Sequence, residues 1–141
     1  MFTLTRKTDY ALIALVHMAQ QERGVLCTAR DITERYHLPP ALLVNVLKVL
    51  VQGELIRSTR GMRGGYALAL PAERITLSAI IKAMEGPIRF VQCSGDAFAG
   101  ESPCELVDSC PVTRPVRKVH DRLVSFLDQV TLAQIAFDEG Y

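Results

Sequence analysis

Apolar residues recur with helical spacing near the start of the chain and predict a buried first helix. The stretch TRKTDYALIALVHMAQQ is apolar on most sides between Tyr10 and Met18. A helix with little polar surface is enclosed by the rest of its domain. Arg6 and Lys7 precede the apolar part, so we expect a core helix with a basic first turn.

Two further helical segments follow, joined by the tight connection 37–39. The first, TARDITERYHL, starts with the Thr-x-x-Asp pattern of a capping box at Thr28. The second, LPPALLVNVLKVLVQGEL, fits a helix that starts at Pro39 and Pro40 and ends at Gly53. Its apolar stripe consists of Leu43, Val46, Leu47 and Leu50. This succession predicts a helix-turn-helix.

In the next stretch, LIRSTRGMRGGYALAL, the apolar residues follow the spacing that is typical of β-strands. LIRST and YALAL read as two strands, and Gly61, Gly64 and Gly65 mark the turn between them. A hairpin that follows a helix-turn-helix is called a wing. The turn of this one contains Arg60 and Arg63. Small residues let a backbone approach phosphates, and an arginine can enter the minor groove. A plain surface hairpin kept soluble by its arginines is the alternative.

A helix LSAIIKAME, capped by Thr76 and stopped at Gly86–Pro87, comes next. The last segment, VTRPVRKVHDRLVSFLDQVTLAQIAF, predicts one long amphipathic helix with Pro115 in its first turn. Its expected seam consists of Val112, Val116, Val119, Leu123, Phe126 and Val130. The helix could fold back onto its own core or pair with its twin. We favour a twofold homodimer, in which two recognition helices read two half-sites.

Together these elements predict a mainly α protein with a small β-hairpin. Residues 1–75 would form a winged helix-turn-helix DNA-binding domain. Residues 76–111 would supply a connecting helix and a loop that holds most of the cysteines. Residues 112–141 would form the dimerisation helix and a C-terminal tail.

Composition adds the class of protein. Of the 141 residues 49% are hydrophobic and 22% are charged, as in ordinary globular domains. No apolar run is long enough to span a membrane, and the N-terminus lacks the regions of a signal peptide. We therefore expect a cytoplasmic protein, in which clustered cysteines more often bind metal or carry out redox chemistry than form structural disulfides.

Charge separates the two halves of the chain. Residues 1–70 carry a net charge of +4 and residues 71–141 carry −3. A basic first half could meet a polyanion, although chance imbalance on solvated faces is an equal alternative. The sequence has no glycine-rich phosphate loop, nucleophile elbow or paired His/carboxylate motif, and its histidines are scattered at positions 17, 37 and 120. It therefore predicts no enzyme.

The segment CSGDAFAGESPCELVDSC holds three of the four cysteines. Its four carboxylates belong to Asp96, Glu101, Glu105 and Asp108, and it contains no Lys, Arg or His. The spacing lacks the C-x-x-C pairs of a zinc ribbon. A reactive sensor thiol needs nearby positive charge, whereas a metal centre would offset the repulsion among thiolates and carboxylates. We favour a metal site over an oxidised pair, which would leave one cysteine over. Cys27 reads as a small buried hydrophobe.

Five stretches in order resemble the Rrf-type winged-helix regulators, the family of the iron–sulfur sensor IscR and the nitric-oxide sensor NsrR. They are LTRKTDYAL, RGMRGGYALA, IIKAMEGPI, the three-cysteine segment and HDRLVSFLDQVTLAQIA. GPI, CELVDSCPV and VTLAQIA make the chain most similar to regulators of the Suf iron–sulfur assembly system. The resemblance implies a transcriptional regulator whose DNA binding depends on a two-iron or four-iron cluster, and we expect a repressor. Cluster supply, redox state, oxygen or nitric oxide would be its signal.

The resemblance also implies the ligands. Cys93, Cys104 and Cys110 match the family's cluster cysteines, although the gap after Cys93 exceeds the common five residues. Thr113 stands where IscR-type members have a histidine ligand. Asp9 matches the acidic residue that completes the site from the other subunit in NsrR-like members. A helix dipole alone also favours an acidic residue there.

Several residues are candidates for DNA contact. Asn45 can hydrogen-bond adenine, and Ala41 or Leu42 can touch a thymine methyl group. The expected DNA-binding set is Arg6, Lys7, Ala41, Leu42, Asn45, Lys48, Arg57, Ser58, Arg60, Arg63, Gly64 and Gly65. Arg6, Lys7, Arg57 and Ser58 are the expected phosphate contacts. The competing hypothesis is a winged-helix regulator with a disulfide- or zinc-braced loop and no iron–sulfur cluster.

Overall fold

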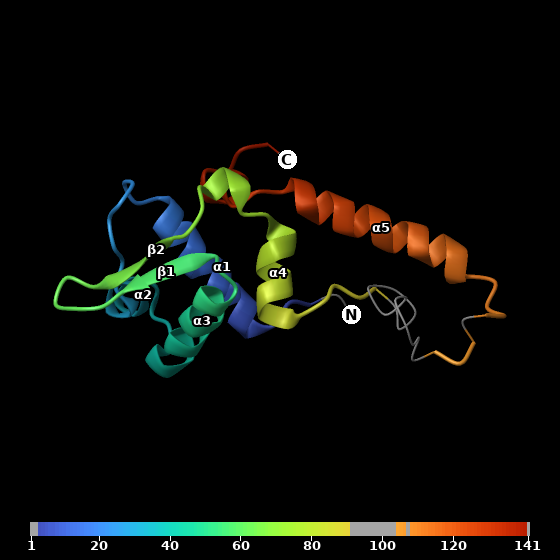
Figure 1. Ribbon diagram of the computed structural model, residues 1–141, viewed down its shortest axis with the longest axis horizontal. Coiled ribbons are helices and arrows are strands. Elements are labelled where there is room, and N and C mark those ends of the chain that lie inside the picture. Colours follow the sequence, from blue (N-terminus) through green and yellow to red (C-terminus); the bar gives the residue numbers. More distant parts are fainter. Residues whose placement is uncertain (1–2, 91–103, 107, 141) are drawn as a thin grey trace.

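A small helical body carries a hairpin on one side and a long projecting helix on the other in the computed structural model (Figure 1). The structure describes residues 3–90, 104–106 and 108–140. In chain order the elements are α1 (Arg6–Ala19), α2 (Ala29–Tyr36), α3 (Pro40–Gln52), β1 (Ile56–Thr59), β2 (Gly65–Leu68), the 3-10 turn η1 (Ala72–Arg74), α4 (Leu77–Glu85), α5 (Thr113–Gln129) and α6 (Leu132–Ala136). The predicted fold class, mainly α with one antiparallel hairpin, is confirmed.

Threonine side chains fix where four of the helices begin. The Thr28 hydroxyl accepts a hydrogen bond from the Asp31 N–H at 3.0 Å, and the Asp31 carboxylate accepts from the Thr28 N–H at 3.1 Å. This is the predicted capping box. Thr131 and Gln134 form a second capping box at α6, and the Thr5 and Thr76 side chains accept a backbone N–H at the starts of α1 and α4. The caps are local patterns, so the starts of these helices follow from short stretches of sequence.

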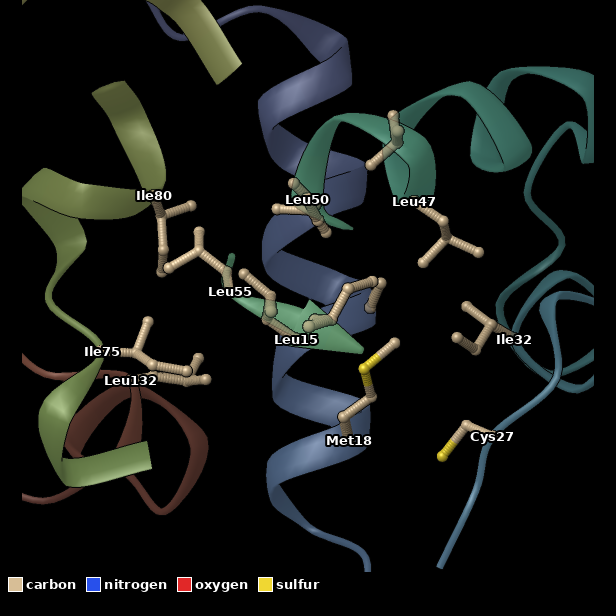
Figure 2. Close-up of a cluster of buried hydrophobic side chains, with 14 of the residues drawn as sticks. Leu15, Met18, Cys27, Ile32, Leu47, Leu50, Leu55, Ile75, Ile80 and Leu132 are labelled. Atoms are coloured by element: carbon tan, nitrogen blue, oxygen red, sulfur yellow. The ribbon is translucent and has the colours of Figure 1, made fainter. Parts of the chain in front are cut away.

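The core lies where α1 crosses α3, with α2, α4 and α6 around them (Figure 2). All four residues of the predicted α3 stripe are at most 1% exposed. Leu15 from α1 and Ile80 from α4 are fully buried beside them. Cys27 is 3% exposed among these apolar side chains, which confirms its interpretation as a small buried hydrophobe. Burial raises the pKa of its thiol.

The wing is anchored to the segment before α2. In the hairpin Ile56 pairs with Leu68 and Thr59 pairs with Gly65. The Cys27 N–H donates to the Tyr66 carbonyl at 2.8 Å, and the Tyr66 N–H donates to the Cys27 carbonyl at 2.7 Å. Besides β1, the bridge gives β2 a second backbone partner. The base of the wing is therefore held by the helix-turn-helix body as well as by its own strand pair.

The last segment is not one continuous helix. α5 ends at Gln129, and Val130 is extended and 4% exposed, so it leaves the predicted apolar seam. The Leu77 N–H donates to the Val130 carbonyl at 2.8 Å, and the Leu132 N–H donates to the Ile75 carbonyl at 2.7 Å. Pairing with the residues before α4 thus favours an extended backbone over a further helical turn. α6 follows and returns to the core, where Leu132 is fully buried.

α5 leaves much of its apolar surface uncovered in the described part of the chain. Val112, Val119 and Phe126 are 53%, 49% and 51% exposed, while the helix contacts α4 near its C-terminal end (Figure 1). Side chains of this kind stay half exposed when a helix projects beyond its own domain. Within a single chain, α5 therefore does not fold back on the core along its whole length. No described helix is long and apolar enough to span a membrane.

His17 makes stability depend on pH. It is 8% exposed, and its Nδ1 lies 2.9 Å from the Tyr36 hydroxyl. Burial is the main cause that lowers its pKa below the usual 6.5, nearby Arg35 adds to this, and Asp31 opposes it. The unfolded chain therefore takes up a proton more readily than the folded one. The resulting stability is complete above pH 6.5 and decreases as the pH falls below that value.

We expect the urea concentration at half-unfolding to fall between about pH 7.5 and 5.5, and to fall less in His17→Gln. His37→Asn is the matched control, because His37 is exposed and has a left-handed backbone that asparagine tolerates. This control should keep the wild-type pH dependence. An unchanged pH dependence in His17→Gln would show that another group is responsible.

Candidate DNA interface and cysteine segment

The basic first turn of α1 lies against the end of α4. Arg6 and Lys7 are exposed, as predicted. The Thr5 N–H just before them donates to Glu85 Oε1 at 2.5 Å. This backbone hydrogen bond is the main cause that lowers the pKa of the Glu85 carboxyl. A carboxylate at a helix N-terminus also interacts favourably with the helix dipole. The residue that ends α4 therefore helps to fix the basic first turn.

The face of α3 opposite its buried stripe is accessible. Ala41, Asn45 and Lys48 are exposed, and Leu42 is half-buried. The positions follow from helical geometry, since the stripe that packs against α1 leaves the intervening residues outside. Asn45 supplies an amide and Lys48 an ammonium group on this face. The arrangement is that of a recognition helix with few polar groups available to contact base edges.

The wing presents cations on strand and turn. Arg57 and Ser58 are exposed on β1, and Arg60 and Arg63 are exposed in the turn. All of the wing residues predicted to contact DNA other than the two glycines are thus accessible to a partner. Among the described residues Arg30 forms an ion pair with Glu34, and none of these wing arginines forms one there.

Gly64 and Gly65 have a structural role that sequence reasoning missed. A Cβ atom at Gly64 would lie 2.2 Å from the Thr59 carbonyl oxygen, and one at Gly65 would lie 2.9 Å from the Cys27 carbonyl oxygen. Real Cβ atoms do not approach backbone oxygens so closely. Both glycines are therefore required for closure and anchoring of the hairpin. Their predicted close approach to phosphate stays a prediction.

Part of the cysteine segment is described. Cys104 and Cys110 are half-exposed, and Cys93 lies outside the described residues, as do Asp96 and Glu101. The Cys110 N–H donates to the Leu106 carbonyl at 2.8 Å, which turns the chain just before α5. Two soft sulfur donors thus precede α5 in the chain, and thiolates are the ligands that an iron–sulfur centre requires.

Cys110 has a thiolate-favouring environment that the sequence pattern did not reveal. A backbone hydrogen bond from Val112 is the first cause that lowers its pKa, and the Thr113 side chain adds another. Arg114 and Arg117 from α5 line the same surface hollow as Cys110 and Asp108. The segment itself is acidic, but positive charge comes from the helix that follows it. Our expectation that this thiol has only negative surroundings was wrong, since it considered the segment without α5.

The predicted ligands do not meet within one described chain. Asp9 is exposed on the first turns of α1, and the described residues contain no cluster of three or more His, Cys, Asp or Glu side chains. Cys93 lies outside these residues, so the described part of the chain contains two of the three predicted cysteine ligands. The donor chemistry of Cys104 and Cys110 fits an iron–sulfur cluster. A contribution from Asp9 would have to come from a second chain.

Comparisons with known proteins agree along nearly the whole chain. The family model Rrf2, described as an iron-dependent transcriptional regulator, matches residues 4–138. An HTH-type transcriptional regulator of Haemophilus influenzae is 32% identical over 132 residues, which cover 94% of this chain and 85% of the relative.

Two solved structures show the same fold. CymR of B. subtilis, described as its global cysteine regulator, has a TM-score of 0.76 at 24% identity, covering 97% of this chain and 98% of that one. IscR of T. potens has a TM-score of 0.71 at 27% identity, covering 99% and 89%. With the winged helix-turn-helix in place and the family model matched from end to end, this chain belongs to the Rrf2 family of transcriptional regulators.

Proposed function

We propose that this regulator binds duplex DNA through α3, the wing and the first turn of α1. The observation that carries this proposal is the wing, whose exposed Arg57, Arg60 and Arg63 have no part in the described core. Asn45 and Lys48 on the free face of α3 would contact base edges and phosphate in the major groove. Arg6 and Lys7 would contact the DNA backbone.

The binding form would be a homodimer built on α5. Val112, Val119 and Phe126 on that helix are about half exposed, and burying such surface against a second copy is favourable. A twofold pair would present two recognition helices to two half-sites of an operator. We propose repression as the regulatory outcome.

An iron–sulfur cluster held by Cys93, Cys104 and Cys110 would control DNA binding. The family's description as iron-dependent, the resemblance to cluster-binding regulators and the half-exposed Cys104 and Cys110 just before α5 support this proposal. When bound, such a cluster supplies a centre that responds to redox state or nitric oxide. The chain's part is to hold it at the start of α5, the helix that would join the two subunits. Cluster loss would then alter the spacing of the recognition helices.

Control by thiols alone, with no cluster, is the second candidate. Its supporting observation is Cys110 at the beginning of α5, where backbone hydrogen bonds favour a thiolate near Arg114 and Arg117. The likeness in fold to a cysteine regulator makes this hypothesis relevant. Anaerobic purification followed by iron and acid-labile sulfide analysis separates the two. Visible absorption together with similar contents of iron and sulfide supports the cluster. A colourless protein whose DNA binding changes when a reductant is added supports control by thiols.

Arg60 tests how the wing binds. Arg60→Ala should weaken binding to the cognate operator by about 1–3 kcal/mol more than binding to random duplex, if the guanidinium reads groove shape. Arg74→Ala is the control, because Arg74 is an exposed arginine on η1, outside the proposed interface. Fluorescence anisotropy at several salt concentrations measures both effects. An equal loss on the two DNAs would reduce Arg60 to a phosphate contact. Absence of any operator preference in wild-type protein would disprove the proposed function.

A further inference from the structure

Met62 at the tip of the wing is fully exposed. Its relative exposure is 106%, whereas the other exposed large hydrophobic side chains in the described part of the chain reach at most 66%. Met18 lies in the core and Met84 packs against it. A single exposed apolar residue needs no explanation by itself. Met62 differs because it is fully exposed, lies between two arginines and belongs to a hairpin that is anchored to the core.

The turn that carries Met62 is held in shape from both sides. The Gly64 N–H donates to the Gly61 carbonyl at 3.0 Å, and Gly61 has a φ of +113°. The strands below are paired with each other and bridged to the core through Cys27. Arg60 and Arg63 are exposed on either side of Met62. The protein therefore presents an apolar tip between two cations on an anchored hairpin.

This combination matches the minor groove of DNA. A narrow minor groove concentrates negative potential that attracts arginine side chains, and apolar side chains, methionine among them, enter it in other proteins. At A·T pairs the groove floor offers acceptors only, whereas a G·C pair adds the guanine N2 amino donor. Arginine has donors only and a thioether is a weak acceptor, so the tip has no strong partner for that amino group. Covering it would leave a donor unsatisfied.

We propose that Met62 enters the minor groove of the operator and selects against G·C pairs beneath the wing. The inference rests on the proposed DNA-binding function and adds a specificity-determining residue to it. Met62 supplies the apolar contact, and Arg60 and Arg63 supply donors to the A·T acceptors. Selection arises from the amino group that G·C alone places on the groove floor.

The test uses a duplex that wild-type protein enriches from a randomised pool. DNA footprinting locates the wing site on this duplex. It is the part that wild-type protein protects from cleavage and that Arg60→Ala does not. Base pairs there are changed one at a time to A·T, G·C or I·C, because inosine keeps the major-groove oxygen and nitrogen of guanine but lacks the N2 amino group. Wild-type protein should bind I·C about as tightly as A·T, and G·C roughly tenfold more weakly.

Variants of Met62 assign the effect to this side chain. Met62→Gln has similar length but can accept from the amino group, and it should bind G·C and I·C duplexes equally. Met62→Ala should weaken binding to the A·T duplex roughly fivefold, with the salt dependence unchanged because no charge is removed. Leu70→Gln, a polar change at a 42% exposed leucine beyond β2, should behave as wild type. Thermal unfolding should be unaffected in all three.

The outcomes separate this inference from the function on which it rests. Wild-type affinity and undiminished discrimination against G·C in both Met62 variants would overturn the role of Met62 while leaving operator binding intact. Equal binding of wild-type protein to I·C and G·C would do the same. A pool from which no duplex is enriched would overturn the proposed function and the inference with it.

Discussion

Cys104→Ala and Cys110→Ala are each expected to abolish the visible absorption of protein purified without oxygen. Both cysteines are half-exposed just before α5, and each would supply one thiolate to the proposed cluster. A cluster that loses one of three cysteine ligands has no described replacement beside it, since Cys27 is buried in the core. Iron and acid-labile sulfide content, with the visible spectrum, measure the loss.

Two further variants complete this experiment. Cys93→Ala should have the same effect, because the resemblance assigns it the third thiolate. Cys27→Ala is the matched control, since it removes a thiol that packs between Met18 and Ile32 (Figure 2), and it should keep full cluster content. Undiminished iron and sulfide in any loop variant would remove that cysteine from the ligand set. Loss in Cys27→Ala alone would point to a fold defect, which circular dichroism would detect.

Asp9→Ala is expected to leave the fold and the dimer intact but to make the cluster labile. Asp9 is exposed on α1 and does not join the described cysteines within one chain. A carboxylate is a harder and weaker ligand for iron than a thiolate, so its corner of the cluster would react first with oxygen or nitric oxide. Asp9→Cys should therefore react more slowly. Stopped-flow loss of visible absorption after exposure to oxygen compares the three proteins.

Mixed subunits test whether Asp9 acts across the dimer. A heterodimer of one Asp9→Ala chain and one Cys104→Ala chain, isolated with two different tags, has both lesions in a single site if Asp9 comes from the partner. The other site is then intact, and the cluster content should be about half that of wild type. If Asp9 acts within its own chain, each site has one lesion and neither is complete. Content equal to that of two damaged sites would exclude ligation across the dimer, and failure to isolate any heterodimer would contradict the proposed pairing through α5.

Local sequence patterns accounted for much of the fold. Thr28 with Asp31 marked the start of α2, Thr76 and Gly86 bounded α4, and Gly53 ended α3 where predicted. Caps and helix periods involve residues within a few positions of each other, so a short stretch contains the information needed. The same holds for the wing turn, where a positive φ at Gly61 needs glycine.

The candidate site was predictable to a lesser extent. The sequence predicted which wing and α3 residues would contact DNA, and these residues are exposed or half-exposed. It did not indicate that Gly64 and Gly65 close the hairpin against Thr59 and Cys27, because the clash depends on atoms of other segments. Composition of the cysteine segment likewise gave the wrong charge for Cys110, since Arg114 and Arg117 belong to the next helix.

The sequence by itself determined the order and type of the elements, the apolar face of each helix and the family. Only the tertiary structure decided that the last helix breaks at Val130, that Leu132 returns to the core beside Ile75, and that Glu85 meets the N-terminus of α1. The physical reason is the distance along the sequence between the residues that interact. The caps and periods that define an element are local, whereas these three features join hydrogen-bonding groups 53 to 80 positions apart, whose pairing depends on how the whole core packs.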